Sequence, residues 1–192
     1  MNESRSDADV VVLVEGESDA AAVVTLADRY GIPSGRLLPV VAFGVTNYTR
    51  ILTELAHRRP VVRIVGLYDE PEEHVVRRAV IAAGLGTANG RADLERLGFH
   101  ACVTDLEAEL IRAIGTDRVE QVIEHEGELP SLLRFRAQPA QRGRPADQQL
   151  HRFMGTKSMR KIRYGRLLAA AVDLDAVPDP LRRVTLDVLP PA

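Results

Sequence analysis

The chain has 192 residues, 45% of them hydrophobic and 27% charged, and a formal net charge of −2 at pH 7. These totals are typical of one medium-sized globular domain, or of one domain with a small appendage. The single cysteine, Cys102, excludes an internal disulfide, no apolar run is long enough to cross a membrane, and the N-terminus lacks a secretory signal. We therefore predict a soluble, cytoplasmic protein with no membrane partner.

The first predicted element is a strand over residues 10–14, where an unbroken run of Val and Leu is typical of burial on both faces of a parallel sheet. Glu15 and Asp19 follow it, and Ser18 or Asp19 is expected to cap the next helix. Glu15 then lies at the carboxyl end of the strand, where open α/β sheets bind their ligands. The alternative is that this Glu-Gly-x-x-Asp motif is only a turn followed by a helix cap.

Three more strands are predicted at residues 37–43, 61–68 and 99–103, with helices between them. Pro39 favours an edge position for the first of these three. Strands that alternate with helices form βαβ units and hence a parallel sheet. We therefore predict an α/β, Rossmann-like fold with about four parallel strands flanked by helices.

The chain changes character near residue 130, after which only helices are predicted. Residues 131–192 carry 12 Lys and Arg against 5 Asp and Glu, whereas residues 1–130 carry 13 against 22. We predict an α/β domain over residues 9–130 and a basic helical extension over residues 131–192 that packs on it, with Ser158 as a helix cap. A basic surface beside an acidic site suits a metal-dependent enzyme that acts on a polyanion. The alternative is that the basic part only lies against the acidic part.

Acidic residues follow each strongly predicted strand. Glu15 and Asp19 follow the first strand, Asp69 the third, and Asp105 and Glu107 the fourth. Strand ends of a parallel sheet lie at one edge, so these carboxylates would repel one another unless a cation lay among them. Such oxygen ligands suit Mg²⁺ or Mn²⁺, which also binds substrate phosphate. Helix capping, which favours Asp and Glu at the same places, is the alternative.

The sequence does not indicate zinc chemistry, a serine-hydrolase elbow or a phosphate loop. The histidines are scattered and have no cysteine pair beside them, so we interpret each as a surface or core residue. They are His57, His74, His100, His125 and His151.

Taken together, the acidic motifs resemble those of a Toprim domain. They are Glu15-Gly16-x-x-Asp19, the acidic turn at Asp69, and Asp105-Leu106-Glu107. The segment Asp-Leu-Glu-Ala-Glu-Leu and the later Lys157-Ser158-Met159-Arg160-Lys161 resemble the branch found in OLD (overcoming lysogenization defect) nucleases. The resemblance covers about residues 9–170 and implies a Toprim fold.

The resemblance also implies a function, which is Mg²⁺- or Mn²⁺-dependent hydrolysis of nucleic-acid phosphodiesters, or nucleotidyl transfer or hydrolysis, in DNA repair or phage defence. The implied metal ligands are Glu15, Asp19, Asp69, Asp105 and Glu107, of which Glu15 and Asp69 are also catalytic. Nucleic acid, DNA more than RNA, is the implied partner. Because the chain has no phosphate loop, any ATPase would be a separate subunit, and a homodimer is a further expectation.

Basic residues downstream of the acidic motifs are candidate phosphate contacts. The only two lysines, Lys157 and Lys161, are four residues apart and would share a helix face if the helix begins early enough; both are candidate catalytic residues, and Lys161 is the preferred phosphate contact. Further candidates for binding phosphate or nucleic acid are Arg142, Arg144, Arg160 and Arg163. The alternative is that these arginines are only solvated charges.

The sequence departs from the family pattern at one position. The second family motif is Asp-x-Asp, but here it reads Asp69-Glu70-Pro71. Pro71 cannot bind a metal, so Glu70, Glu72 or Glu73 would have to substitute for the missing acid. If none does, the alternative function is a catalytically impaired module that binds nucleic acid or a partner ATPase.

Overall fold

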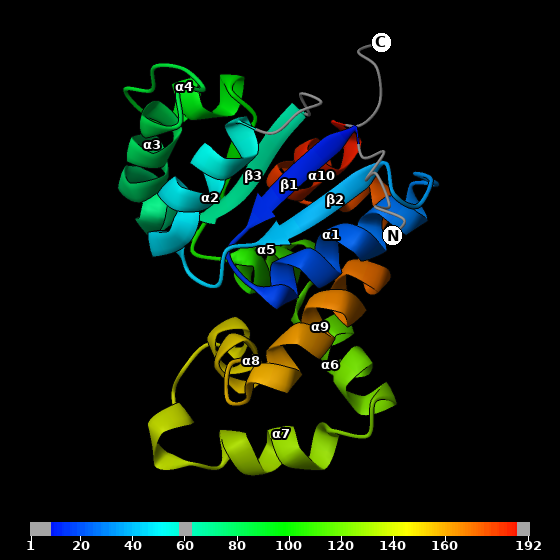
Figure 1. Ribbon diagram of the computed structural model, residues 1–192. Helices are drawn as coiled ribbons and strands as arrows, with labels where there is room; N and C mark the ends of the chain where they lie inside the picture. Colours follow the sequence, from blue (N-terminus) through cyan, green and yellow to red (C-terminus); the bar gives the residue numbers. More distant parts are fainter. Residues whose placement is uncertain (1–8, 58–62, 188–192) are drawn as a thin grey trace, which may run out of the picture.

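The computed structural model describes residues 9–57 and 63–187, and within these ranges it is an α/β fold built on one parallel sheet (Figure 1). The strands, in the spatial order β2-β1-β3-β4, are β1 (Val10–Val14), β2 (Leu37–Val41), β3 (Arg63–Asp69) and β4 (Phe99–Cys102). The predicted fold class is confirmed. β2 lies at an edge, as Pro39 predicts, because proline cannot donate to a neighbouring strand. Val61 and Val62, predicted to begin the third strand, lie outside the described residues.

Helices make up most of the remaining described chain. They are α1 (Glu17–Arg29), α2 (Tyr48–Ala56), α3 (Glu73–Ala82), α4 (Arg91–Arg96), α5 (Leu106–Ile114), α6 (Thr116–His125), α7 (Leu129–Arg136), α8 (Ala146–Met154), α9 (Ser158–Ala171) and α10 (Asp179–Leu186). Short 3-10 turns join some of them, among them η2 (Glu70–Glu72) between β3 and α3. No helix of the described part is long and apolar enough to cross a membrane.

Alternation along β1 divides the core into two layers. Val10, Val12 and Val14 point to one face of the sheet, where they pack with residues of α1 and α5 to α10. Val11 and Leu13 point to the other face, which is covered by α2, α3 and α4 (Figure 1). Burial on both faces explains why the sequence of β1 shows no alternation of apolar and polar residues.

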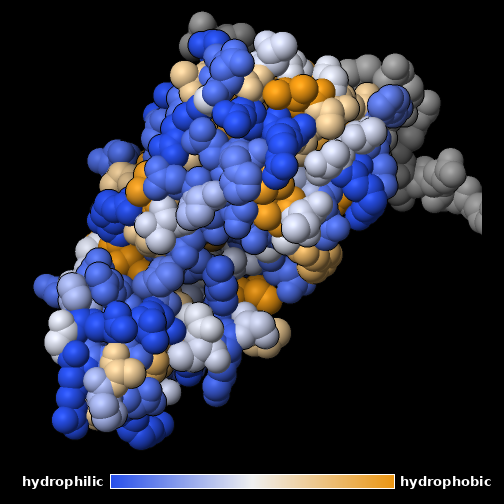
Figure 2. All heavy atoms as spheres, turned by 90° about the vertical axis from the view of Figure 1, so that its left-hand side faces the viewer, coloured by the Kyte–Doolittle hydropathy of each residue, from blue (hydrophilic) through white to orange (hydrophobic). Residues whose placement is uncertain are grey.

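Helices α6, α7 and α8 extend the first of these layers away from the sheet (Figure 1). Buried residues of α6, α7 and α8 belong to the same apolar cluster as those of β1 and α1. Figure 2 shows these helices as a narrow lobe below the α/β part, with a largely hydrophilic surface on which hydrophobic side chains are scattered. Helix α6 was not predicted from the sequence, whereas α7 lies at the start of the stretch predicted to be helical, and the division into domains at residue 130 stays a prediction.

Helix α9 lies close against the start of α1, and a glycine permits this approach. A Cβ atom on Gly165 would lie 2.7 Å from the main-chain oxygen of Ser18, which is closer than packed atoms come. The predicted cap Ser158 is instead the first residue of α9, which Lys157 precedes as the capping position. Lys161 lies about one helical turn before Gly165, so the close approach carries its side chain to the N-terminus of α1.

We expect the Gly165→Ala substitution to destabilise the fold by about 1–3 kcal/mol, because its methyl group must push α9 away from the main chain of Ser18. At an exposed position inside a helix, replacing glycine by alanine stabilises the protein by up to about 1 kcal/mol. A loss of stability would therefore indicate that α9 and α1 are in close contact at Gly165. Gly155→Ala is the matched control: its Cβ would lie 3.7 Å from the nearest neighbouring atom, an ordinary contact, and it should be neutral or mildly stabilising. Urea unfolding measures both, and a Gly165→Ala variant as stable as the wild type would contradict this packing of α9 on α1.

Candidate metal centre

Carboxylates from two strand ends and a lysine from α9 line one cavity of about 370 Å³ at the carboxyl edge of the sheet. The lining residues are Glu15, Gly16, Asp19, Phe43, Gly44, Asp69 and Lys161. Residues that lie far apart in the sequence thus meet at one place. Their arrangement agrees with the geometric expectation that the ends of parallel strands share an edge.

The turn after β1 fixes the first two acids. Glu15 follows the last residue of the strand, and Gly16 is the extended residue that precedes α1. The prediction that Ser18 or Asp19 caps α1 is wrong, because Gly16 occupies the capping position and Ser18 is buried. Asp19 has a related role, since its Oδ2 accepts a 2.8 Å hydrogen bond from the main-chain N–H of Gly16. This bond holds the Asp19 carboxylate beside Glu15.

Burial and mutual repulsion raise the pKa of the acids in this cavity. Burial, followed by repulsion from Asp19, Glu15 and Asp105, raises the pKa of Asp69 to about 8. Burial and repulsion from Glu107 raise the pKa of Asp19 to about 7, although the hydrogen bond from Gly16 opposes the shift. These upward shifts in pKa indicate a cluster whose negative charge exceeds the positive charge of the nearby basic groups.

Two further acids enter from the start of α5. Glu107 is only 2% exposed, and its Oε2 lies 3.2 Å from Lys161 Nζ. Burial raises the pKa of Glu107, and the charge of Lys161 opposes that shift. Asp105 caps α5, where its Oδ1 accepts a 2.9 Å hydrogen bond from the main-chain N–H of Ala108. Lys161 therefore lies between the cavity and the acids of α5.

Asp105 is also paired with a histidine that no motif in the sequence marks. Its Oδ2 lies 2.6 Å from Nε2 of His151, which comes from α8. Burial would raise the pKa of Asp105, but the hydrogen bonds from His151 and Ala108 outweigh it, so the pKa is lowered. The pair spans 46 residues, and no local spacing could have revealed it.

The structure separates the three glutamates that could replace the acid missing at Pro71. Glu70 and Glu73 form ion pairs with Arg91, at 2.7 and 3.3 Å. Glu72 lies close enough to Glu15 for its charge to contribute to raising the pKa of Glu15, after the larger effect of burial. Of the three candidates, only Glu72 therefore lies near the acidic cluster without an ion pair to Arg91.

The basic candidates are also separated. Lys161 lines the cavity, whereas Lys157 is exposed at the start of α9. Arg160 is buried, stacks on the ring of Phe153 at 4.1 Å and pairs with Glu128, so we remove it from the predicted phosphate contacts. The sequence could not reveal this, because the stacking and the ion pair are tertiary contacts.

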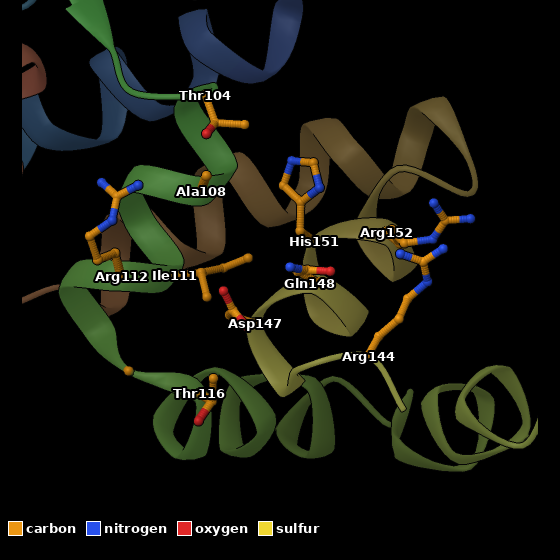
Figure 3. A pocket seen from close by; sticks show the side chains of 11 residues that line it. Thr104, Ala108, Ile111, Arg112, Thr116, Arg144, Asp147, Gln148, His151 and Arg152 are labelled. Carbon is orange, nitrogen blue, oxygen red and sulfur yellow. The ribbon is translucent and has the colours of Figure 1, made fainter. Parts of the chain in front are cut away.

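Three other arginines remain near the molecular surface. Arg163 pairs with Glu126, Arg142 is exposed, and Arg144 donates a 2.9 Å hydrogen bond to the main-chain oxygen of Ala140. Arg144 also lines a second pocket, which lies between α5 and α8 and has a volume of about 610 Å³ (Figure 3). Arg112, Arg152 and His151 line the same pocket, as do Asp147 and Gln148. Basic groups thus gather beside the Asp105–His151 pair.

Comparisons with known proteins bear on the fold that carries these groups. No family model and no curated protein sequence matches the chain. The C-terminal region of the OLD protein of Xanthomonas campestris pv. campestris has a similar structure, with 23% identity, a TM-score of 0.68 and coverage of 95% of each chain. The C-terminal region of the Burkholderia pseudomallei OLD protein is similar at 17% identity, with a TM-score of 0.66, over 94% of this chain and 96% of that one. The resemblance predicted from the sequence is confirmed at the level of the fold.

The raised pKa of Asp69 predicts a pH dependence of stability when divalent cations are absent. The ordinary pKa of this carboxyl is 3.8, and its pKa in the fold is about 8. Between these values the folded protein retains a proton that the unfolded chain has lost, so stability falls as pH rises and the stabilisation is gone above about 8. We expect the melting temperature to fall between about pH 5 and about pH 8.

The Asp69→Asn variant should show a shallower dependence, because asparagine does not titrate. Asp28→Asn is the matched control, since Asp28 is exposed on α1, and it should keep the wild-type slope. Thermal unfolding in a chelator at several pH values measures all three proteins. Equal slopes for wild type and Asp69→Asn would show that the fold does not hold a proton on Asp69.

Proposed function

We propose that this chain, which shares its fold with the C-terminal regions of two OLD proteins, is a divalent-metal-dependent hydrolase of nucleic-acid phosphodiesters. The observation that carries the proposal is the meeting of carboxylates from three strand ends around one lysine. Such a cluster has too few basic neighbours to balance its charge, and a cation supplies the balance.

The residues present fit a cation. The carboxylate of Glu107 is buried, and its charged partner among the described residues is Lys161, 3.2 Å from Oε2, so acceptor positions on the carboxylate stay open at a cost in free energy. Glu15, Asp19, Asp69, Asp105 and Glu107 would hold the metal, as the sequence predicts. When bound, Mg²⁺ or Mn²⁺ would neutralise charge on the scissile phosphate and lower the pKa of a coordinated water.

Residues of the chain itself would orient the substrate and move protons. Lys161 presents an ammonium group to the cavity, where it can bind a non-bridging phosphate oxygen as a point charge. Burial and then the charge of Glu72 raise the pKa of Glu15, and a carboxyl with a raised pKa is a better proton donor and acceptor in general acid–base catalysis than an unshifted one. Phe43 lines the cavity with 74% of its surface exposed and a φ of 53°, and it offers a face on which a neighbouring base can stack.

The 610 Å³ pocket offers a path for the rest of a polyanionic substrate. Arg144 and Arg152 line it, as does Arg112, which pairs with Glu109 at 2.9 Å (Figure 3). His151, on the wall of the pocket, lies 2.6 Å from Asp105 of the acidic cluster. Guanidinium groups bind phosphates in bidentate geometry, so a strand whose scissile phosphate lay in the first cavity would find further contacts here. The separate ATPase subunit and the homodimer stay predictions.

A second candidate function is a module that binds nucleic acid, or a partner ATPase, without cleaving anything. The observation that favours it is the turn after β3, where Pro71 offers no ligand and Arg91 holds both Glu70 and Glu73. On this view the acidic cluster would be the remnant of a catalytic site.

The Glu15→Gln variant separates the two functions. We expect the wild type to cleave plasmid DNA or single-stranded RNA with Mg²⁺ or Mn²⁺ and not in EDTA. Glu15→Gln should be slower by at least about 10²-fold, because it removes both a metal ligand and a proton-transfer group. Glu17→Gln is the matched control, since Glu17 is exposed two residues along, and it should cleave normally.

Gel assays under initial-rate conditions measure the cleavage. Wild-type protein that binds nucleic acid without metal-dependent cleavage would support the second candidate and reject the hydrolase. Cleavage by Glu15→Gln at the wild-type rate would also reject the mechanism, because the activity would then come from elsewhere.

Replacing Arg144 and Arg152 together by alanine should weaken DNA binding and reduce its dependence on salt. Each lost phosphate contact lowers the slope of log K against log salt by about 0.7–0.9. Arg36→Ala is the control, since Arg36 pairs with Asp9 at the opposite, amino end of the strands. Fluorescence anisotropy at several salt concentrations measures the slope, and an unchanged slope in the double variant would exclude this pocket from the binding surface.

A further inference from the structure

We propose that His151 is a nitrogen ligand of a divalent transition-metal ion, which Asp105 and Glu107 bind with it. The inference rests on the proposed function and deepens it, because it names the donor set and the class of ion at one cation position. One ligand atom from each of the three residues lies within 4.8 Å of the others. Asp105 and Glu107 are at the start of α5, and His151 is on α8.

Glu107 is the first observation that points to a ligand. Its carboxylate is almost fully buried, and apart from the ion pair with Lys161 neither oxygen has a hydrogen-bond partner within the described residues. The nearest positive charge is Lys161 Nζ at 3.2 Å, and Lys161 also faces the neighbouring acidic cavity. A buried carboxylate with open acceptor positions is costly unless another group fills them. A cation beside Glu107 would do so.

His151 is the second observation. Its Nε2 is held 2.6 Å from Asp105 Oδ2, so the ring is already oriented toward the acids of α5. Figure 3 shows the imidazole on α8 opposite Thr104 and Ala108, at the wall of the 610 Å³ pocket. A cation that binds between the two side chains would replace the proton they now share, and that proton would leave to solvent.

This position differs from the first cavity in its chemistry. None of its three residues lines the cavity formed by Glu15, Asp19 and Asp69, which offers only oxygen ligands. An imidazole nitrogen favours first-row transition ions, whereas Mg²⁺ prefers oxygen ligands alone. Mn²⁺ accepts both kinds of donor, so we expect it to bind here more tightly than Mg²⁺ does.

A purely structural role for the histidine is the competing explanation. The Asp105–His151 bond ties α8 to α5, and such a tie stabilises the fold without any metal. It does not account for Glu107, which lies beside the pair and whose buried oxygens have, within the described ranges, no partner apart from the ion pair with Lys161. If the histidine is only structural, its nitrogen does not coordinate a bound ion. Spectroscopy that detects nitrogen coordination therefore distinguishes the two explanations.

The test uses the full chain with Mn²⁺ alone and pulsed electron paramagnetic resonance. We expect ¹⁴N modulation from a directly bound imidazole in the wild type, and its loss in His151→Gln. We also expect at least about tenfold weaker Mn²⁺ binding by that variant. In competition experiments, the preference of the protein for Mn²⁺ over Mg²⁺ should be smaller in His151→Gln than in the wild type. His125→Gln is the matched control, since His125 is exposed on α6, and it should keep the signal.

The inference is overturned if the wild-type protein does not bind Mn²⁺, or if it binds Mn²⁺ without ¹⁴N modulation. It is also overturned if the ¹⁴N signal persists in His151→Gln. Circular dichroism checks the fold of each variant. If His151→Gln does not fold, Glu107→Gln replaces it and should bind Mn²⁺ more weakly. This experiment measures the bound ion and does not depend on cleavage. Nitrogen coupling in a protein that does not cleave nucleic acid would reject the proposed hydrolase activity alone. Cleavage without nitrogen coupling would reject the assignment of His151 as a ligand alone.

Discussion

The ion pair between Lys161 and Glu107 ties α9 to the start of α5, beside the cluster of carboxylates at the edge of the sheet. Glu107 enters from the helix that follows β4, and Lys161 enters from α9, far along the chain. The pair can form because Gly165 lets α9 approach the main chain of Ser18. The same approach brings the lysine against the cavity that holds Glu15 and Asp69. The candidate site therefore depends on packing between helices as much as on the sheet.

The charge of the site is not balanced by the chain alone. Five carboxylates meet near one lysine and one histidine, and burial strengthens every repulsion among them. Part of the chain's response is to hold protons, since the pKa values of Asp19 and Asp69 are raised to about 7 and about 8. A cation would relieve the same repulsion and allow these groups to ionise, so protons and metal compete for one site. Negative charge of this kind costs stability, and strongly shifted pKa values of this kind are found most often at functional sites.

The helical part contributes what the sheet cannot. The strand ends and the turns after them provide oxygen ligands, whereas α8 provides an imidazole and, with the loop before it, two arginines that face a pocket. This division agrees with the uneven charge of the sequence, in which acidic residues outnumber basic ones 22 to 13 up to position 130 and basic residues outnumber acidic ones 12 to 5 after it. Arg160 shows that not every basic residue serves the surface, because its guanidinium is used to pack Phe153 and pair with Glu128.

The fold class, and the edge of the sheet at which the acids lie, could be predicted from the amino-acid sequence. Hydrophobic runs that end in Glu15, Asp69 and Asp105 suffice for this, because parallel strands bring their carboxyl ends together. The edge position of β2 follows in the same way from Pro39. These are local signals, and local signals can be recognised in a single sequence. The sequence did not predict which of the candidate basic residues reach the acidic cavity. In the structure Lys161 lines the cavity, Lys157 is exposed and Arg160 is buried elsewhere.

Pairings between side chains that belong to no sequence motif could not be predicted either. Tertiary contacts paired Glu70 and Glu73 with Arg91, and they paired His151 with Asp105 across 46 residues. Such pairings depend on how helices pack. Packing is set by close approaches such as that of Gly165 to Ser18, which the identity of one residue permits but does not reveal.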